Sequence, residues 1–325
     1  MRFFIACLLL FAVLLNPAKA AELKIVASIA PLHSLAASVM HGIAEPQLLL
    51  EASLSPHSIS LQPSHARMLA EADLVIWVGE ELEPFLARPL TQLSARRQLA
   101  LMHAQGVQLY PWREHREVAT EQDQDHEEDD HSREHDHDHE EDEHSHEHEH
   151  ENEDPHIWLS PTNARAILAA IAARLSEIDP ANAAHYKSNA SAASAVIQKK
   201  QDEIKFRLAP YAQARFIVFH DGYQYFERSF GLATSGVISL HPESPPGAKR
   251  IAAIRSALQH EEIACVFSEP QFSQRLTSRL VQGTPTRVGL LDPIGAKLTP
   301  GRLLYLQLID NLAASFISCL SGREN

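Results

Sequence analysis

The sequence has no long apolar run beyond its N-terminus. A transmembrane helix needs about 20 mostly apolar residues, and no segment after residue 20 is continuously apolar over about 18. The N-terminus itself has Arg2, an apolar run over residues 3–15 and the small-residue site Ala18-Lys19-Ala20. This is the pattern of a secretory signal peptide. We expect residues 1–20 to be removed after about Ala20, leaving an exported, soluble chain.

Cysteine is also scarce. Of the three cysteines, Cys7 lies inside the signal peptide, too far from the cleavage site to be a lipid-anchored first residue. Cys265 and Cys319 remain in a compartment that permits disulfides. We expect one bridge between them that ties the last helix to the C-terminal half, with two buried free thiols as the alternative.

Basic residues are outnumbered, 28 against 42 acidic ones, but the imbalance is local. Residues 121–154 contain 19 acidic residues, nine histidines and one arginine, a charge of −18. The whole sequence has a net charge of −14, and the signal peptide accounts for +2 of it. Without the signal peptide and residues 121–154, the remaining chain has a net charge of only +2. A near-neutral body gives no indication of nucleic acid or an anionic membrane as a partner.

This acidic, histidine-rich tract has almost no apolar residues, so it cannot offset the entropy of ordering its backbone. We predict a disordered loop over residues 115–153. Dense imidazoles and carboxylates can still hold a metal loosely in many registers. Its nine histidines are therefore candidate weak, auxiliary metal ligands: His126, His131, His135, His137, His139, His144, His146, His148 and His150.

The rest of the chain alternates β-rich runs with helical patterns, which predicts parallel, helix-covered sheets. Before the tract, the predicted strands are 23–28, 47–50 and 73–79, with helices 31–41, 64–72 and 83–93 and one more candidate strand within 100–109. Beyond residue 208, the predicted strands are 215–220, 263–268 and 287–291, with helices 223–230, 246–259, 274–282 and 302–320.

Two helices are predicted between these halves. The first helix covers residues 162–178. The second helix begins at Asp179 and Pro180, which suit the N-cap and the first helical position. It can run to Leu208, where Ala209-Pro210 ends it. That helix would be about 40 Å long, more than one small domain needs. We predict an N-terminal α/β lobe (21–178), a linking helix (179–208) that braces the molecule, and a C-terminal α/β lobe (209–325).

Three histidines fall in loops next to strand ends or helix starts, where α/β lobes present ligands: His57, His156 and His220. None has the short His-x-x-x-His spacing of a helix-borne metal site. Taken singly, each is more readily a hydrogen-bonded loop or core histidine. The sequence also lacks a phosphate-binding loop and a nucleophile elbow.

Several segments together resemble the periplasmic zinc-binding component of ABC uptake transporters, the ZnuA type, in cluster A-I (family 9) of the solute-binding proteins. These segments occur in the family's order over nearly the whole mature chain. They are 55–57 (SPH), 60–64 (SLQPS), 72–79 (ADLVIWVG), 155–161 (PHIWLSP), 218–226 (VFHDGYQYF), 245–247 (PPG), 265–272 (CVFSEPQF) and 291–295 (LDPIG). A His/Asp/Glu-rich insertion just before the PHIWL segment is also typical of that family.

The resemblance implies a zinc site in the cleft between the lobes, with His57, His156 and His220 as ligands. Asp292 matches the position where manganese-selective relatives place a carboxylate. Pro56 stands where zinc-type relatives can have a glutamate. The fourth ligand therefore stays open between water, Asp292 and a residue of the tract.

The resemblance also implies a location and partners. We expect a monomer in the periplasm of a Gram-negative bacterium that delivers Zn²⁺ to the membrane permease of an ABC transporter. An auxiliary periplasmic zinc chaperone is a further candidate partner, and no nucleic acid is expected.

The ligand types bear on the metal independently. Three neutral imidazoles and one oxygen favour zinc, whereas a carboxylate-rich site would suit manganese. Copper and nickel also bind imidazoles. Two other functions stay open: a zinc-dependent hydrolase with a His₃–water site and Asp221, Asp292 or Glu269 as its base, and a periplasmic zinc buffer that acts through the tract.

Overall fold

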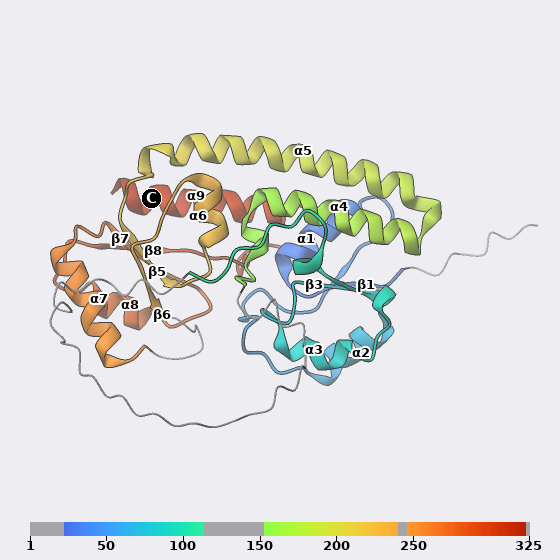
Figure 1. The fold of residues 1–325 in the computed structure, drawn as a ribbon, viewed down its shortest axis with the longest axis horizontal. Coiled ribbons are helices and arrows are strands. Elements are labelled where there is room, and N and C mark those ends of the chain that lie inside the picture. Colours follow the sequence, from blue (N-terminus) through green and yellow to red (C-terminus); the bar gives the residue numbers. More distant parts are fainter. Residues whose placement is uncertain (1–22, 114–152, 240–245, 323–325) are drawn as a thin grey trace, which may run out of the picture.

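The computed structural model describes residues 23–113, 153–239 and 246–322. The predicted signal peptide and the nine histidines of the tract lie outside the described residues. Within them, the chain forms two α/β lobes, each built on a parallel four-stranded sheet (Figure 1). The predicted fold class is therefore confirmed.

The N-terminal lobe has the strand order β2-β1-β3-β4. Its strands are β1 (Ile25–Ala27), β2 (Gln47–Leu48), β3 (Leu74–Trp77) and β4 (Gln98–Ala100), and its helices are α1 (Ala30–Val39), α2 (Pro63–Glu71) and α3 (Pro84–Leu90). The central strands β1 and β3 are buried throughout, as expected for a parallel sheet covered on both faces.

The C-terminal lobe repeats this arrangement with the order β6-β5-β7-β8. Its strands are β5 (Phe216–His220), β6 (Gly236–Ser239), β7 (Cys265–Ser268) and β8 (Arg287–Leu290), and its helices are α6 (Gln224–Phe230), α7 (Ala248–His260), α8 (Gln274–Leu280) and α9 (Leu304–Ser321). Strand β6 was not predicted, because it opens with a glycine and has only two strongly apolar residues. The candidate strand predicted within residues 100–109 corresponds to β4, which begins two residues earlier, at Gln98.

Helices α4 (Pro161–Ile178) and α5 (Ala183–Leu208) connect the lobes. Residues Pro180–Asn182 form a 3₁₀ turn ahead of α5, where the sequence predicted a continuous α-helix. With 26 residues, α5 is about 39 Å long and runs across both lobes above α4 and α9 (Figure 1). The predicted long bracing helix is present.

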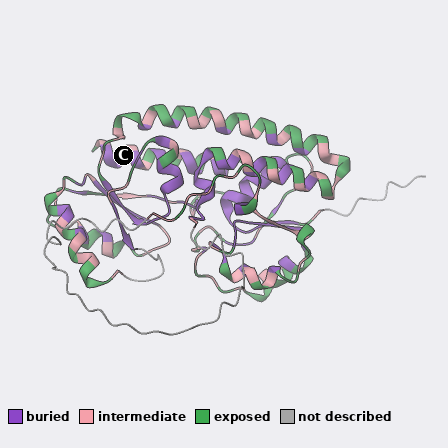
Figure 2. Cartoon of the chain, viewed as in Figure 1, coloured by how far each residue is buried: buried purple, intermediate pink, exposed green. Residues whose placement is uncertain are grey.

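The two lobes share one apolar core on the side covered by these helices. Buried residues from β1 and α1, from α4 and α5, and from β5, β7 and α9 form a single cluster. Figure 2 shows the buried residues running through both sheets and the inner helices, while α5 exposes its outer face. The lobes are therefore joined by packing as well as by the chain.

Helix α9 is the one helix in the described part of the chain that is long and apolar enough to cross a membrane, with a mean hydropathy of 1.3. Half of that window is buried, and α9 packs against α1, α5 and β8. A core helix passes the same test of length and composition, so these contacts account for its apolar character.

The predicted disulfide between Cys265 and Cys319 forms, with the two residues 54 positions apart in sequence. It joins β7 to the end of α9. Because this link closes a long loop in the unfolded chain, it stabilises the fold by reducing the entropy of that chain.

Replacing both cysteines by alanine should lower the free energy of unfolding by about 2–4 kcal/mol. Chemical denaturation of C265A/C319A beside the oxidised wild-type chain measures this loss. Adding reductant to the wild-type chain is the control and should reproduce most of it. An unchanged denaturation midpoint in both cases would contradict the prediction.

Candidate metal centre

Three imidazoles converge between the lobes. The Nε2 atom of His156 lies 3.3 Å from Nε2 of His57 and 3.2 Å from Nε2 of His220. The ligand atoms of all three lie within 4.8 Å of one another. His57 comes from the loop between β2 and α2, His156 precedes the 3₁₀ helix η3 (Ile157–Leu159), and His220 ends β5. The structure thus brings together the three histidines singled out in the sequence.

The two separations that involve His156 match the spacing of ligands around a tetrahedral ion. Nitrogens at about 2.0–2.1 Å from zinc lie about 3.3–3.4 Å apart at tetrahedral angles, but only about 2.8–3.0 Å apart at right angles. The observed 3.2 and 3.3 Å are close to the tetrahedral values. The cavity among the three rings measures about 10 Å³, roughly the space of one water molecule or one ion.

The ring of His156 is fixed by Asp154, two residues earlier. One oxygen of this carboxylate, Oδ1, accepts a hydrogen bond from Nδ1 of His156 at 2.8 Å and another from its backbone N–H at 3.0 Å. Both side chains are essentially inaccessible to solvent. With its proton assigned to Nδ1, the imidazole presents the lone pair of Nε2 to the cavity.

The ring of His220 is fixed in the same way by Glu269, whose Oε1 lies 2.5 Å from Nδ1. The sheet register explains the pairing: Phe216 pairs with Cys265 and Ile217 with Val266 across β5 and β7. Continuing the parallel register past the strand ends puts His220 opposite Glu269. The carboxylate is 1% exposed, so it remains close to this imidazole.

His57 differs from the other two. Its recorded partners are the Ser55 hydroxyl, which accepts from its backbone N–H at 3.4 Å, and the ring of His156. Its side chain is only partly buried and lies on a loop. The site therefore consists of two carboxylate-fixed imidazoles and one that is held less firmly.

Burial shapes the protonation of the three rings. It lowers the pKa of His57 and of His156 well below 6.5, and the neighbouring imidazoles lower both further. Burial also lowers the pKa of His220, but the charge and hydrogen bond of Glu269, together with the charges of Asp221 and Asp154, outweigh it and give a net rise. At neutral pH the first two rings are neutral, the form that coordinates a metal.

Gly222 is required by the packing of the site. A Cβ atom at this position would lie 2.3 Å from Nε2 of His220 and 3.0 Å from Nε2 of His156. The backbone of the loop after β5 therefore lies directly against the two imidazoles, and any larger residue there would displace them.

Asp292 is not brought into the cluster. Its oxygens accept hydrogen bonds from the backbone N–H groups of Ile294, Gly295 and Ala296 at 3.2, 2.8 and 2.6 Å, and from the side chain of Gln271. It does not line the cavity among the imidazoles, although its neighbours Pro293 and Ile294 do. The auxiliary histidines of the tract lie outside the described residues.

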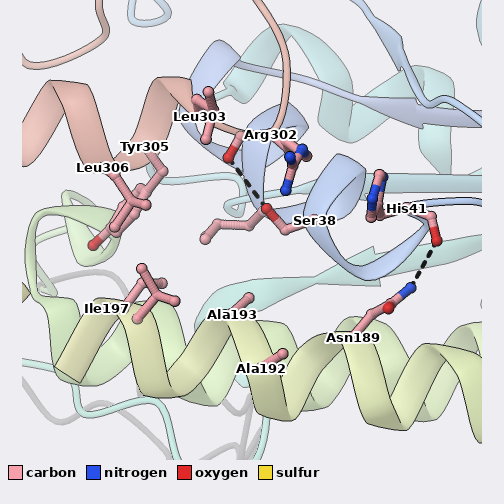
Figure 3. Close-up of a pocket in the computed structure, with 12 residues that line it drawn as sticks. Ser38, His41, Asn189, Ala192, Ala193, Ile197, Arg302, Leu303, Tyr305 and Leu306 are labelled. Carbon is pink, nitrogen blue, oxygen red and sulfur yellow. Dashed lines mark hydrogen bonds between the residues drawn. The ribbon is translucent and has the colours of Figure 1, made fainter. Parts of the chain in front are cut away.

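A larger hollow of about 270 Å³ lies elsewhere, between α1, α5 and the start of α9 (Figure 3). Its lining is mainly apolar, and His41 is the one histidine in it. With no cluster of metal-binding side chains among the residues that line it, this hollow is not the metal site.

Comparison with known proteins identifies the family. Residues 25–319 match the family described as ZnuA, zinc-uptake complex component A, periplasmic. The chain belongs to this family. It is 42% identical over 313 residues to the high-affinity zinc uptake system protein ZnuA of Brucella suis, covering 91% of each chain, and 35% identical to the Yersinia pestis protein of that name, covering 94% of each.

A solved structure of a ZnuA deletion mutant with zinc bound has the same fold, with a TM-score of 0.70, 23% identity and coverage of 94% of this chain and 99% of the other. The resemblance inferred from the sequence is confirmed, and so is the periplasmic location. Because the family consists of transport binding proteins rather than enzymes, membership in it rules against the zinc-dependent hydrolase.

Sequence reasoning missed the two carboxylates that orient the rings. Asp154 was counted with the acidic tract, although Asp-Pro-His beside a buried Trp is a local signal. Glu269 was considered only as a base for a hydrolase. Its contact with His220 follows from the adjacency of β5 and β7, which the sequence does not state.

Gly222→Ala should reduce zinc affinity on the order of 100-fold, because the new methyl group overlaps the His220 ring and shifts a ligand. Calorimetry or chelator competition measures the change. Gly247→Ala is the matched control, since a Cβ atom there meets nothing within 4 Å. Equal affinities in the two variants would show that the close contact at Gly222 does not matter.

Proposed function

We propose that this protein captures Zn²⁺ in the periplasm with His57, His156 and His220 and delivers it to the membrane permease of an ABC transporter. The observation that carries the proposal is that three imidazoles surround a cavity of one ion's size, with Nε2 of His156 at tetrahedral spacing from Nε2 of both other rings. Relatives that cover more than nine-tenths of the chain are named for high-affinity zinc uptake.

The choice of zinc follows from the donors. The two carboxylates nearest the imidazoles, Asp154 and Glu269, are each engaged through one oxygen with an Nδ1 atom, while three imidazoles present nitrogen to the cavity. A nitrogen-rich tetrahedral site suits zinc, whereas manganese prefers oxygen donors and octahedral geometry. Asp292 would have to give up its hydrogen bonds to coordinate, so we assign the fourth position to water.

The proposal includes the organisation of the molecule and its partners. Residues 21–178 and 209–325 act as the two lobes around the site, with 179–208 as the linking helix. The chain works as a monomer that docks on the permease, and an auxiliary periplasmic zinc chaperone is a candidate partner. The tract's histidines serve as a weak, secondary zinc-collecting segment.

A deletion variant distinguishes zinc capture by the three-histidine site from zinc buffering by the histidine-rich tract. Removing residues 121–152 spares Glu153, which pairs with Pro111. This variant should still bind one zinc tightly, and His220→Ala in the same background should lose it, because only two imidazoles remain. Calorimetry gives the stoichiometry and affinity. If the deletion variant bound no tight zinc, the three-histidine site would be rejected in favour of the tract.

Zinc affinity should fall as the pH is lowered from about 8 to about 5. The raised pKa of His220 means that its proton is the first with which zinc competes, beginning above pH 6.5. His57 and His156, with lowered pKa values, compete only at lower pH. Calorimetry in buffers of different ionisation enthalpy counts the protons released. An affinity that is constant over this range would contradict three histidine ligands.

A further inference from the structure

A short segment crosses from the N-terminal lobe to the C-terminal lobe beside the metal centre. We call residues 107–113 the strap. Its first part is held to α4, where Asn163 exchanges two hydrogen bonds of 2.9 Å with the backbone of Gln108. Its second part is held to α6: the Tyr225 hydroxyl accepts from Tyr110 N–H at 3.1 Å, and Gln224 donates to the Pro111 carbonyl at 3.1 Å.

The segment that carries His156 runs alongside the strap and is held by the same helix. Glu153 pairs with Pro111, and Asp154 N–H donates to the Tyr110 carbonyl at 2.8 Å. From α6, Tyr225 donates to the Asp154 carbonyl at 2.8 Å and Gln224 to the Asp154 carboxylate at 3.2 Å. The anchor of His156 therefore depends on α6, an element of the other lobe.

Arg113, at the end of the strap, makes the strongest of these contacts. Its guanidinium donates to both oxygens of Asp221, with Nε at 3.2 Å from Oδ2, and to Oε2 of Glu227 at 2.6 Å. The two carboxylates are 9% and 3% exposed. Burial raises the pKa of Glu227, and the charge of Arg113 acts against that rise. One cation thus pairs with two buried carboxylates on the C-terminal lobe.

The position of Asp221 links this ion-pair cluster to the metal centre. Asp221 directly follows His220, and Glu227 lies on α6, which begins four residues after His220. Arg113 therefore fastens the strap to the loop that carries one ligand, while the strap itself pairs with the segment that carries another. His57 has no comparable tie among its recorded contacts.

We propose that Arg113 is a positioning residue for zinc capture, which holds His156 and His220 as a preassembled pair that His57 completes. This inference rests on the proposed function of the three histidines. The physical reason is that two buried imidazoles in their metal-binding form, each with its proton on Nδ1, direct the lone pairs of Nε2 atoms 3.2 Å apart at one another. Ligands held against this repulsion in advance cost less to organise when zinc binds.

The test compares Arg113→Met and Arg113→Lys with a matched control, Arg174→Met. Arg174 has a side chain 24% exposed, against 26% for Arg113, and donates to the carbonyls of Ala95, Arg96 and Gln98, none of which lines the metal centre. Chelator competition gives zinc affinity. The visible absorption of Co²⁺ bound in place of zinc reports how tetrahedral the site is.

We expect Arg113→Met to weaken zinc binding about 10- to 100-fold and to reduce the Co²⁺ absorption. Arg113→Lys should fall between it and the wild type, because an ammonium keeps the charge but cannot span both carboxylates. Arg174→Met should retain wild-type affinity and absorption. Equal zinc affinity in Arg113→Met and the wild type, or an equal loss in Arg174→Met, would overturn the proposal.

A second variant separates a loss of zinc binding from a failure to fold. Arg113→Met leaves Glu227 unpaired, so Arg113→Met/Glu227→Gln removes that buried charge as well. The double variant should fold and still show the weakened zinc binding; wild-type affinity in it would also overturn the proposal. Wild-type protein that fails to bind zinc tightly, or His220→Ala that binds as well as the wild type, would instead reject the proposed function itself.

Discussion

The metal centre depends on holding three imidazoles together so that they surround one small buried cavity. Nothing in the rings themselves favours this arrangement, because their Nε2 lone pairs converge and burial strips them of solvent. Two carboxylate–imidazole hydrogen bonds, Asp154 to His156 and Glu269 to His220, hold two of the rings in this arrangement by fixing the orientation and proton of each. The third ring, His57, lacks such an anchor among its recorded contacts, so the site is rigid on one side and more adjustable on the other.

The architecture around the site supports this asymmetry. The shared core and the long helices α5 and α9 join the two lobes. The lobes can therefore move relative to each other less freely than domains connected by a flexible linker. Trp158 donates a hydrogen bond to the Pro293 carbonyl at 2.8 Å, and Tyr305 donates one to the Trp158 carbonyl at 2.9 Å. His156 is therefore tied to the C-terminal lobe although its chain precedes the linking helices. A residue that belongs to one lobe by its place in the sequence can thus be held in position by the other lobe.

Much of this could be predicted from the sequence because the signals were local. Continuous apolar runs such as residues 74–77 marked buried parallel strands, and Asp179-Pro180 marked the start of the long helix region. The three histidines followed from the resemblance of ordered segments to one family. The remaining features depend on neighbours in space: β6 exists as a strand because β5 lies beside it, Glu269 reaches His220 through the register of β5 and β7, and Arg113 meets partners 108 and 114 residues away.

The pairing of Pro111 with Glu153 has a consequence for how this protein can vary. Because these two residues are neighbours, the chain between them begins and ends at adjacent points of the folded body. In general, doubling the length of a loop whose ends are fixed close together adds only about 0.6 kcal/mol of closure entropy. Insertions and deletions in this region are therefore nearly neutral for folding.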